Sequence, residues 1–169
     1  MQTETDLFAK LGIPADYGRG LRRYADATQL VDAEHNVIGR MQRLAPATAK
    51  AWRELKQAAL EEDIELLLIS GFRSIAYQVE LFRNKLASGQ SITEILRVNT
   101  APGYSQHHTG KAIDLATPGA RPLTEDFEST RAFAWMREHA RRFGFNMPFK
   151  RDNPQGFIYK PWHWSQLDS

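Results

Sequence analysis

The stretch GYSQHHTGKAIDLA, residues 103–116, joins a glycine-bounded loop that holds two adjacent histidines to a short apolar run. The run Lys111–Ala116 is typical of a β-strand. Its period of two places Asp114 and the flanking alanines on one face, and Ile113 and Leu115 on the other. A carboxylate on a half-buried strand is costly unless a positive partner offsets its charge. Asp114 therefore predicts either an ion pair with an arginine or a bound metal ion.

Two histidines could share a metal ion with Asp114. His107 stands seven residues before it, in the loop that leads into the same strand. His163 lies in YKPWHW, flanked on both sides by tryptophans that supply an apolar surround. A loop histidine is often merely solvated, and His108 shows that not every histidine here is needed as a ligand. Neutral imidazoles and one carboxylate nevertheless form a normal zinc set, with the fourth position left to water.

Length and composition fit one compact domain. The chain has 169 residues, of which 42% are hydrophobic and 25% charged, as in ordinary globular proteins. The formal net charge is only +2 and the basic residues are scattered, so we expect no nucleic-acid partner. Because there is no cysteine, disulfides and thiolate metal sites are excluded. Any transition metal must be held by histidine, aspartate or glutamate.

The chain carries no signal for a membrane span. Its first 18 residues include acidic side chains and lack the apolar core of a signal peptide, and no run of 18 apolar residues follows. As written, we expect a cytoplasmic protein. The alternative is a mature form already trimmed, which would face the periplasm or the cell wall. No feature of the sequence indicates an oligomeric state.

Periodicity and turn residues predict mixed helices and strands. Residues 1–45 are expected to form an irregular lead-in with a possible strand near Gln29–Val31. The expected order of elements is compatible with an α+β and with an α/β arrangement alike. Helices are expected from Pro46 through Ala59, at Ile75–Leu86, about Ser91–Val98 and at Thr130–Arg142, and strands at Ile64–Ile69, Lys111–Ala116 and Gly156–Trp164, the last interrupted at Pro161.

Three segments of the chain fit short patterns in one order. SQHHTGKAIDL fits S-x-H-x-x-G-x-A-x-D, PWHW fits the second half of E-P-W-H, and ISGFRSIAYQVELF, residues 69–82, fits S-G-[YF]-R-S…Q. Together they resemble the zinc D-Ala-D-Ala carboxypeptidases of the VanY type, in the hedgehog/LAS-like zinc peptidase superfamily. The resemblance covers residues 46–164 within a single expected domain, 1–169. It implies an α+β fold, with a small, mainly antiparallel sheet that carries the zinc ligands and helices beside it.

The resemblance also implies roles for six residues. Zn²⁺ would be held by His107, Asp114 and His163. Arg73 would bind the terminal carboxylate of a peptide, a task that its bidentate guanidinium suits. The positions of Gln78 and Ser105 match family positions that line the substrate site.

Simpler interpretations of these residues stay open at the sequence level. Arg73 could form a surface ion pair, Gln78 could be a solvated helix residue, and Ser105 could cap a turn. Trp162 is expected to pack in the interior and not to touch the substrate.

The chain departs from the family pattern at Lys160. The pattern has a glutamate three residues before the last histidine, which exchanges protons with the zinc water and the leaving amine. Burial and nearby positive charge both lower the pKa of a lysine, so Lys160 is expected either to turn to solvent or to lose its proton. A neutral amine can act as a base, while a surface position without a role is the alternative. A regular strand would place Lys160 and His163 on opposite faces, so a shared site needs a break at Pro161.

Acidic side chains elsewhere could replace the missing glutamate. Asp152, Glu125 and Asp126 are candidates for such a base, and none of them is assigned because the sequence gives no geometry. Losing positioned acid–base help typically costs about 10² to 10⁴ in rate. Zinc alone still acidifies its water, so slow hydrolysis is compatible with Lys160.

The sequence therefore predicts a zinc metallo-carboxypeptidase. Its partner would be the peptidoglycan stem peptide, from which it would hydrolyse the terminal D-amino acid at a D-Ala-D-Ala or an L,D bond. One alternative is a catalytically impaired protein on the same scaffold, which binds such peptides in a more cationic pocket without cutting them. Another is a wall endopeptidase or lysin, which would act on crosslinked wall.

Overall fold

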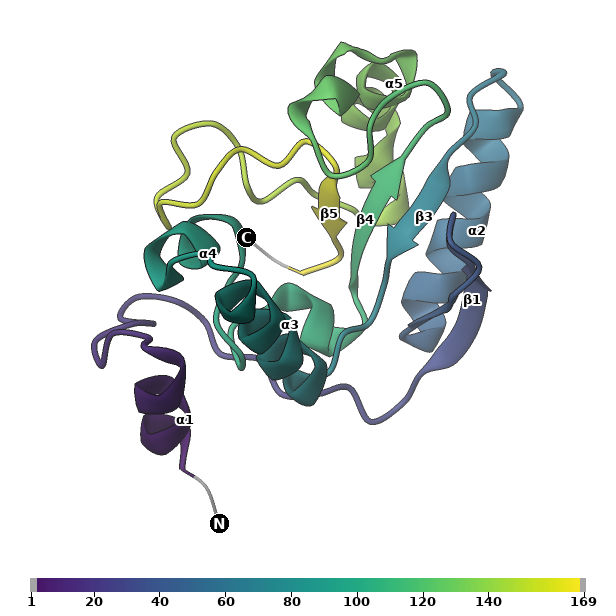
Figure 1. Cartoon of the computed structure of the whole chain (residues 1–169). Helices are drawn as coiled ribbons and strands as arrows, with labels where there is room; N and C mark the ends of the chain where they lie inside the picture. The colour runs from purple at the N-terminus through teal and green to yellow at the C-terminus, as the bar shows by residue number, and fades with distance from the viewer. Residues whose placement is uncertain (1–2, 168–169) are drawn as a thin grey trace.

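A three-stranded antiparallel sheet forms the centre of the computed structural model, which describes residues 3–167 (Figure 1). Its strands lie in the order β3-β4-β5. A separate antiparallel hairpin precedes the sheet in the chain. The α+β class and the mainly antiparallel sheet expected from the sequence are confirmed. The strands are β1 (Val31–His35), β2 (Met41–Leu44), β3 (Leu67–Ser70), β4 (Ala112–Ala116) and β5 (His163–Ser165).

Helices cover both sides of the sheet, with α2 on one side and α3 and α4 on the other (Figure 1). None of the helices in residues 3–167 is long and apolar enough to cross a membrane. The α-helices are α1 (Glu4–Leu11), α2 (Pro46–Leu60), α3 (Ile75–Ala87), α4 (Ile92–Val98) and α5 (Arg131–His139), and the 3₁₀-helices are η1 (Gln106–Thr109), η2 (Glu125–Ser129) and η3 (Ala140–Phe143).

Local sequence signals explain where three of these helices begin. Pro46 occupies the first turn of α2, where its missing N–H costs nothing. The Ser74 side chain caps α3 by accepting a hydrogen bond from the backbone N–H of Tyr77. Ser91 and Glu94 form a reciprocal capping box at the start of α4.

The central strand β4 divides the molecule into a core side and a site side. Ile113 and Leu115 are fully buried in the main apolar core. Asp114, between them in sequence, lines a cavity on the opposite face. The predicted alternation of this strand is confirmed. The core opposite the cavity is built largely from Trp52, Leu55 and Ala59 of α2 and from Phe133, Trp135 and Met136 of α5.

Residues 3–45 are only in part the irregular lead-in that was predicted, because residues 12–30 form neither helix nor strand. The segment 3–45 also contains α1 and the β1–β2 hairpin, and the strand expected near Gln29–Val31 begins only at its last residue. Phe8 and Leu11 of α1 are buried against Phe82 and Tyr104, far along the chain. The sequence carries local signals for this helix, a capping box between Thr3 and Asp6 and a left-handed Gly12 at its end, but its apolar face is too short for periodicity to reveal it.

The predicted strand over Gly156–Lys160 was also wrong. The backbone of this segment forms only isolated hydrogen bonds among those described. The N–H of Ile158 donates to the carbonyl of Arg97, and the N–H of Lys160 donates to the carbonyl of Phe149. These partners lie on different segments, so no ladder forms. Smaller differences are that β3 begins at Leu67 and that α5 ends at His139, beyond which η3 continues.

Two glycines let the loops of the site lie against β2 and the residue that precedes α2. A Cβ on Gly71 would lie 2.6 Å from the carbonyl oxygen of Arg43, so only glycine fits beside β2. Gly110 ends η1 with a φ of +68°, and a Cβ there would lie 2.9 Å from the backbone nitrogen of Ala45. The loops after β3 and before β4 are thereby placed next to each other.

Candidate metal centre and substrate cavity

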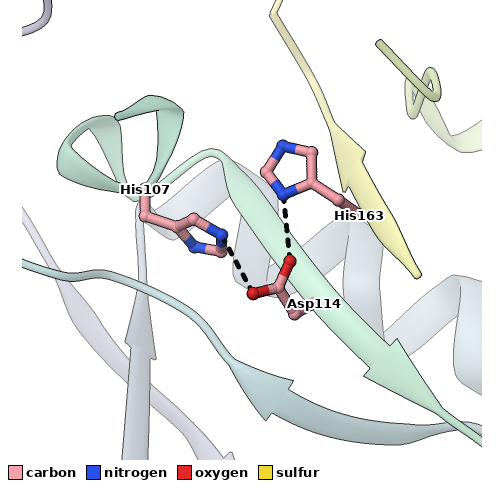
Figure 2. Close-up of side chains that lie close together, drawn as sticks. All are labelled: His107, Asp114 and His163. Carbon is pink, nitrogen blue, oxygen red and sulfur yellow. Dashed lines mark hydrogen bonds and ion pairs between the residues drawn. The ribbon is translucent and has the colours of Figure 1, made fainter. Parts of the chain in front are cut away.

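Three side chains from separate elements converge on one face of the sheet (Figure 2). Asp114 on β4 is paired in register with His163 on β5, and η1 brings His107 to the same place. One ligand atom from each residue lies within 4.8 Å of the other two. The structure thus brings together the three residues predicted as metal ligands.

Both histidines contact the carboxylate of Asp114. Nδ1 of His163 lies 2.9 Å from Oδ1, and Nε2 of His107 lies 3.2 Å from Oδ2. All three side chains are buried, with residue exposures of 1% for His107, 6% for Asp114 and 4% for His163. A carboxylate so far removed from water needs a strong partner.

Hydrogen bonds on the far side of each ring define which nitrogen carries the proton. Nδ1 of His107 lies 2.7 Å from the carbonyl oxygen of Gly71 and donates to it. Nε2 of His163 lies 2.9 Å from Oε1 of Gln106 and donates in the same way. In a neutral imidazole the other nitrogen then has no proton. Each ring therefore directs a lone pair at Asp114.

Two imidazole lone pairs and a carboxylate repel one another unless a cation lies among them. Consistent with this, Nε2 of His107 is buried without a hydrogen-bond partner. The donor set of two neutral imidazoles and one carboxylate, in which the outer ring nitrogens are held by carbonyl oxygens, fits a divalent metal ion such as zinc. The residues present thus suit the metal that the sequence predicted.

The protonation states agree with this arrangement. Burial lowers the pKa of His107 to about 4, with a further contribution from the Arg73 guanidinium. Burial likewise lowers the pKa of His163, so both rings are neutral near pH 7. Burial would raise the pKa of Asp114, and only positive charge at the two ring nitrogens that face it holds the pKa well below its ordinary value; since those nitrogens carry no proton in this arrangement, a bound cation would supply that charge.

A cavity of about 290 Å³ opens beside these three residues. It contains every residue that was predicted to act on the substrate. Besides the three metal-site residues, its walls are formed by Arg73, Gln78, Lys85, Val98, Asn99, Thr100, Ser105, Gln106, Leu123, Phe149, Lys160 and Trp162.

Arg73 is held at the cavity by its backbone. Its N–H donates to the carbonyl of His107 over 3.2 Å, and its own carbonyl accepts from Nδ1 of His108 at 2.6 Å. His108 therefore positions the turn after β3 and does not act as a ligand. The Nε of Arg73 is buried without a partner, and burial lowers the pKa of its guanidinium. Within residues 3–167 it pairs with no carboxylate at ion-pair distance, so the surface ion pair considered from the sequence is not formed.

Gln78 and Ser105 also present polar groups to the cavity. Nε2 of Gln78 donates to the carbonyl of Thr100 at 2.8 Å, which leaves the buried Oε1 without a partner. The hydroxyl of Ser105 accepts from the N–H of His107 at 3.3 Å and so caps η1 while lining the cavity. The solvated position considered for Gln78 is excluded, because the residue is only 1% exposed.

Lys160 lies inside the cavity and not on the surface, since only 9% of the residue is exposed. Its ammonium lies 4.7 Å from the centre of the Phe149 ring and 5.5 Å from that of Phe157. Burial lowers its pKa to about 8, against the opposing effect of Asp114. Because the chain turns at Pro161 and β5 begins only at His163, Lys160 and His163 line one cavity.

None of the acids considered as substitutes for the missing glutamate lines the cavity. Glu125 pairs with Arg151 at 3.6 Å, and Asp126 pairs with Arg121 at 2.7 Å. Asp152 is exposed in a turn. Asp114 is the only carboxylate of residues 3–167 that lines the cavity.

Three residues of the site were not predicted from the sequence. Gln106 holds His163, Phe149 packs against the same ring with centroids 4.9 Å apart, and Lys85 adds a cation to the cavity wall. Gln106 lies in the motif SQHHTGKAIDL, next to His107, so the sequence could have indicated that it belongs to the site. No such indication exists for Lys85 and Phe149, because only the tertiary fold brings them to the site.

Comparison with known proteins identifies one family. The family described as VanY, D-alanyl-D-alanine carboxypeptidase, matches residues 41–168. A putative carboxypeptidase of Bacillus subtilis, YodJ, is 31% identical over 118 residues, which cover 68% of this chain and 43% of that protein. A D-alanyl-D-alanine carboxypeptidase of Enterococcus faecalis is 24% identical over 143 residues, which cover 79% and 52%. The chain thus spans about half the length of these curated relatives.

Solved structures share the fold. The LD-carboxypeptidase LdcB superimposes with a TM-score of 0.73 at 25% identity, over 83% of this chain and 68% of its own. A variant of the vancomycin-resistance D,D-pentapeptidase VanY in complex with Zn(II) gives a TM-score of 0.62 at 23% identity, over 83% and 78%.

Proposed function

The chain belongs to the VanY family of D-alanyl-D-alanine carboxypeptidases, and we propose that it is a zinc-dependent enzyme that removes the terminal D-amino acid from peptidoglycan stem peptides. One observation carries the proposal. His107 and His163, each with its outer nitrogen bonded to a carbonyl oxygen, direct unprotonated nitrogens at the carboxylate of Asp114.

The donor set favours zinc over harder cations. Imidazole nitrogens suit zinc and its neighbours in the first transition row, whereas Mg²⁺ and Ca²⁺ prefer oxygen ligands. Bound by His107, Asp114 and His163, zinc would supply a Lewis acid and an activated water.

The side chains around the metal centre provide the groups that a terminal residue requires. The guanidinium of Arg73 can hold the terminal carboxylate through two parallel hydrogen bonds. The free Oε1 of Gln78 can accept an N–H from the peptide, and the hydroxyl of Ser105 can donate to it. Trp162 and Phe149 form apolar walls that limit access of bulk water. A volume of about 290 Å³ suits one small residue.

Lys160 makes the proposed enzyme a slow one. It lines the cavity where the family pattern has a glutamate, so the carboxylate that would exchange protons with water and leaving amine is missing. Loss of such help typically lowers the rate by about 10² to 10⁴. Orientation of the peptide by Arg73 and the metal centre would remain.

A second candidate is a protein that binds peptide ends without cutting them. The observation that favours it is the charge of the cavity, where Arg73, Lys85 and Lys160 face a single carboxylate. Such a site would retain an anionic peptide terminus even when no group could handle protons.

Release of D-alanine distinguishes the two candidates. The zinc-loaded chain is incubated with one peptide that ends in D-Ala-D-Ala and another that ends in an L,D bond, beside His163→Ala, Lys160→Glu and, as a charge-matched control on an exposed position, Lys150→Glu. Release by the natural chain and by Lys150→Glu, but not by His163→Ala, supports the carboxypeptidase. Release by Lys160→Glu alone supports the binding protein. If no variant releases an amino acid and no peptide binds, both candidates fail.

A further inference from the structure

A larger groove adjoins the cavity. It has a volume of about 600 Å³ and shares Arg73, Lys85, Asn99, Asp114 and Leu123 with the cavity, so the two spaces are continuous. One wall is the tip of the β1–β2 hairpin, residues 36–43, and another is formed by side chains of α3. The side chain of Asn36 ties this hairpin to β3 through a hydrogen bond of 3.1 Å to the carbonyl of Ile69.

The groove is positively charged along its length. Arg40, Arg43, Arg73 and Lys85 line it, whereas Asp114 is the only carboxylate on its walls and is already engaged by the two histidines. Across residues 3–167, none of these four cations lies within ion-pair distance of a carboxylate. The groove therefore presents cations that the protein itself leaves unpaired.

Two of the four cations, Arg73 and Lys85, are close enough for the charge of one to affect the other. The pKa of Lys85 is lowered by burial and, further, by the charge of Arg73. The Arg43 guanidinium lies 5.7 Å from the centre of the Phe72 ring, which holds it on the wall of the groove. An anion placed between Arg73 and Lys85 would relieve the repulsion between them.

The two spaces differ in size and in exposure. The cavity is small and its polar groups are buried, which suits a terminal residue. The groove is twice as large and its rim is open, with Ile38 69% and Tyr77 50% exposed. It has room for several residues of an extended chain and offers apolar side chains beside the cations.

We propose that this groove binds the part of a peptide that precedes the scissile bond, and that it selects peptides with free carboxylates in that part. The inference rests on the proposed function, because it assumes that a peptide terminus occupies the cavity. It adds a substrate class, the acidic peptide, in which carboxylates upstream of the terminal one meet Arg40, Arg43 and Lys85.

Binding of matched acidic and amidated peptides tests the proposal independently of turnover. The ligands are acetyl-Glu-Glu-D-Ala-D-Ala and acetyl-Gln-Gln-D-Ala-D-Ala with a ketomethylene group in place of the last amide, so that neither is hydrolysed. Dissociation constants are measured by calorimetry on the zinc-loaded chain, on the double variant Arg40→Gln/Arg43→Gln and on Arg53→Gln. Arg53 is an exposed arginine on α2 and lines neither space, so it is the matched control.

The acidic peptide should bind the natural chain about five- to tenfold more tightly than the amidated one, and high salt should reduce this difference. The double variant should lose most of the preference while its affinity for the amidated peptide stays within about twofold, and Arg53→Gln should keep the preference. Equal affinities of the natural chain for both peptides would overturn the inference and leave the proposed function intact. A single-stranded oligonucleotide that displaces the acidic peptide at equal concentration would also overturn it, because the groove would then select polyanions in general. If neither peptide binds, the proposed function fails together with the inference.

Discussion

Asp114 and His163 stand directly opposite each other on neighbouring antiparallel strands, and Oδ1 of Asp114 lies 2.9 Å from Nδ1 of His163. The register of β4 and β5 therefore determines the distance between two of the three proposed ligands. A slip of one residue would turn one of these side chains to the opposite face of the sheet. Two of the proposed ligands are thus placed by paired strands, and the third, His107, by the 3₁₀-helix η1.

Zinc should stabilise the folded chain. A ligand that binds only the folded state at a thousandfold excess over its Kd adds about 4 kcal/mol. For a chain of 169 residues this corresponds to a rise of about 10 °C in the unfolding temperature. Differential scanning fluorimetry with added zinc, reversed by a chelator, measures the rise. Asp114→Ala should not respond, whereas Asp152→Ala, which removes an exposed aspartate, should respond like the natural chain; an equal shift in all three would contradict the site.

Gln106 should tune the affinity for zinc without touching the metal. Its Oε1 accepts the Nε2 proton of His163 and so keeps Nδ1 unprotonated. Replacing the amide in Gln106→Leu should weaken zinc binding by about 10- to 100-fold, the usual effect of losing an outer partner. Competition with a chromogenic chelator measures this, and Gln90→Leu, at an exposed position, is the control. An unchanged affinity in Gln106→Leu would show that the tautomer of His163 is set by something else.

Arg73 should act mainly on the binding of the substrate. A lysine keeps the charge but cannot form two parallel hydrogen bonds to a carboxylate. Arg73→Lys is therefore expected to raise KM by about tenfold or more with a smaller effect on kcat, whereas Arg83→Lys, on the exposed side of α3, should change neither. Steady-state kinetics of D-alanine release provide both constants. A fall in kcat at constant KM would assign Arg73 to the chemical step.

The core face of β4 should dominate the stability of the domain. Leu115 is fully buried between the sheet and its helices, so Leu115→Ala should lower the free energy of unfolding by about 2 to 5 kcal/mol. Leu60 is 57% exposed at the end of α2, and Leu60→Ala should cost less than about 0.5 kcal/mol. Urea unfolding measures both. Similar losses for the two variants would contradict the assignment of the core.

The direction of each side chain of β4 was predictable, because successive residues of a strand point to opposite faces of the sheet. This alternation placed Ile113 and Leu115 in the core and Asp114 toward the site, and the structure has this arrangement. The helix α1 was missed although Thr3, Asp6 and Gly12 mark its ends, because its eight residues present too short an apolar face, which is buried against distant residues such as Phe82. Gly156–Lys160 has the composition of a strand but finds no neighbouring strand, so its extended backbone bonds to two separate segments.

The residues of the candidate site also differ in whether the sequence could predict them. His107, Asp114, His163 and Arg73 were found because they lie in motifs whose spacing reflects one scaffold. Lys85 was not predicted, because no local feature of the sequence distinguishes this half-buried lysine from the exposed lysines. The burial of Lys160 likewise follows from the packing of Phe149 and Phe157 around it, which sequence spacing does not encode.

The most direct test of the account is X-ray absorption at the zinc edge, on the chain loaded with one equivalent of zinc and then dialysed. We predict one zinc retained per chain, in a shell of nitrogen and oxygen that includes two imidazoles, and loss of that zinc in the double variant His107→Ala/His163→Ala. Loss of all zinc from the natural chain on dialysis, or retention of zinc with the same spectrum by the double variant, would contradict a metal centre at these residues.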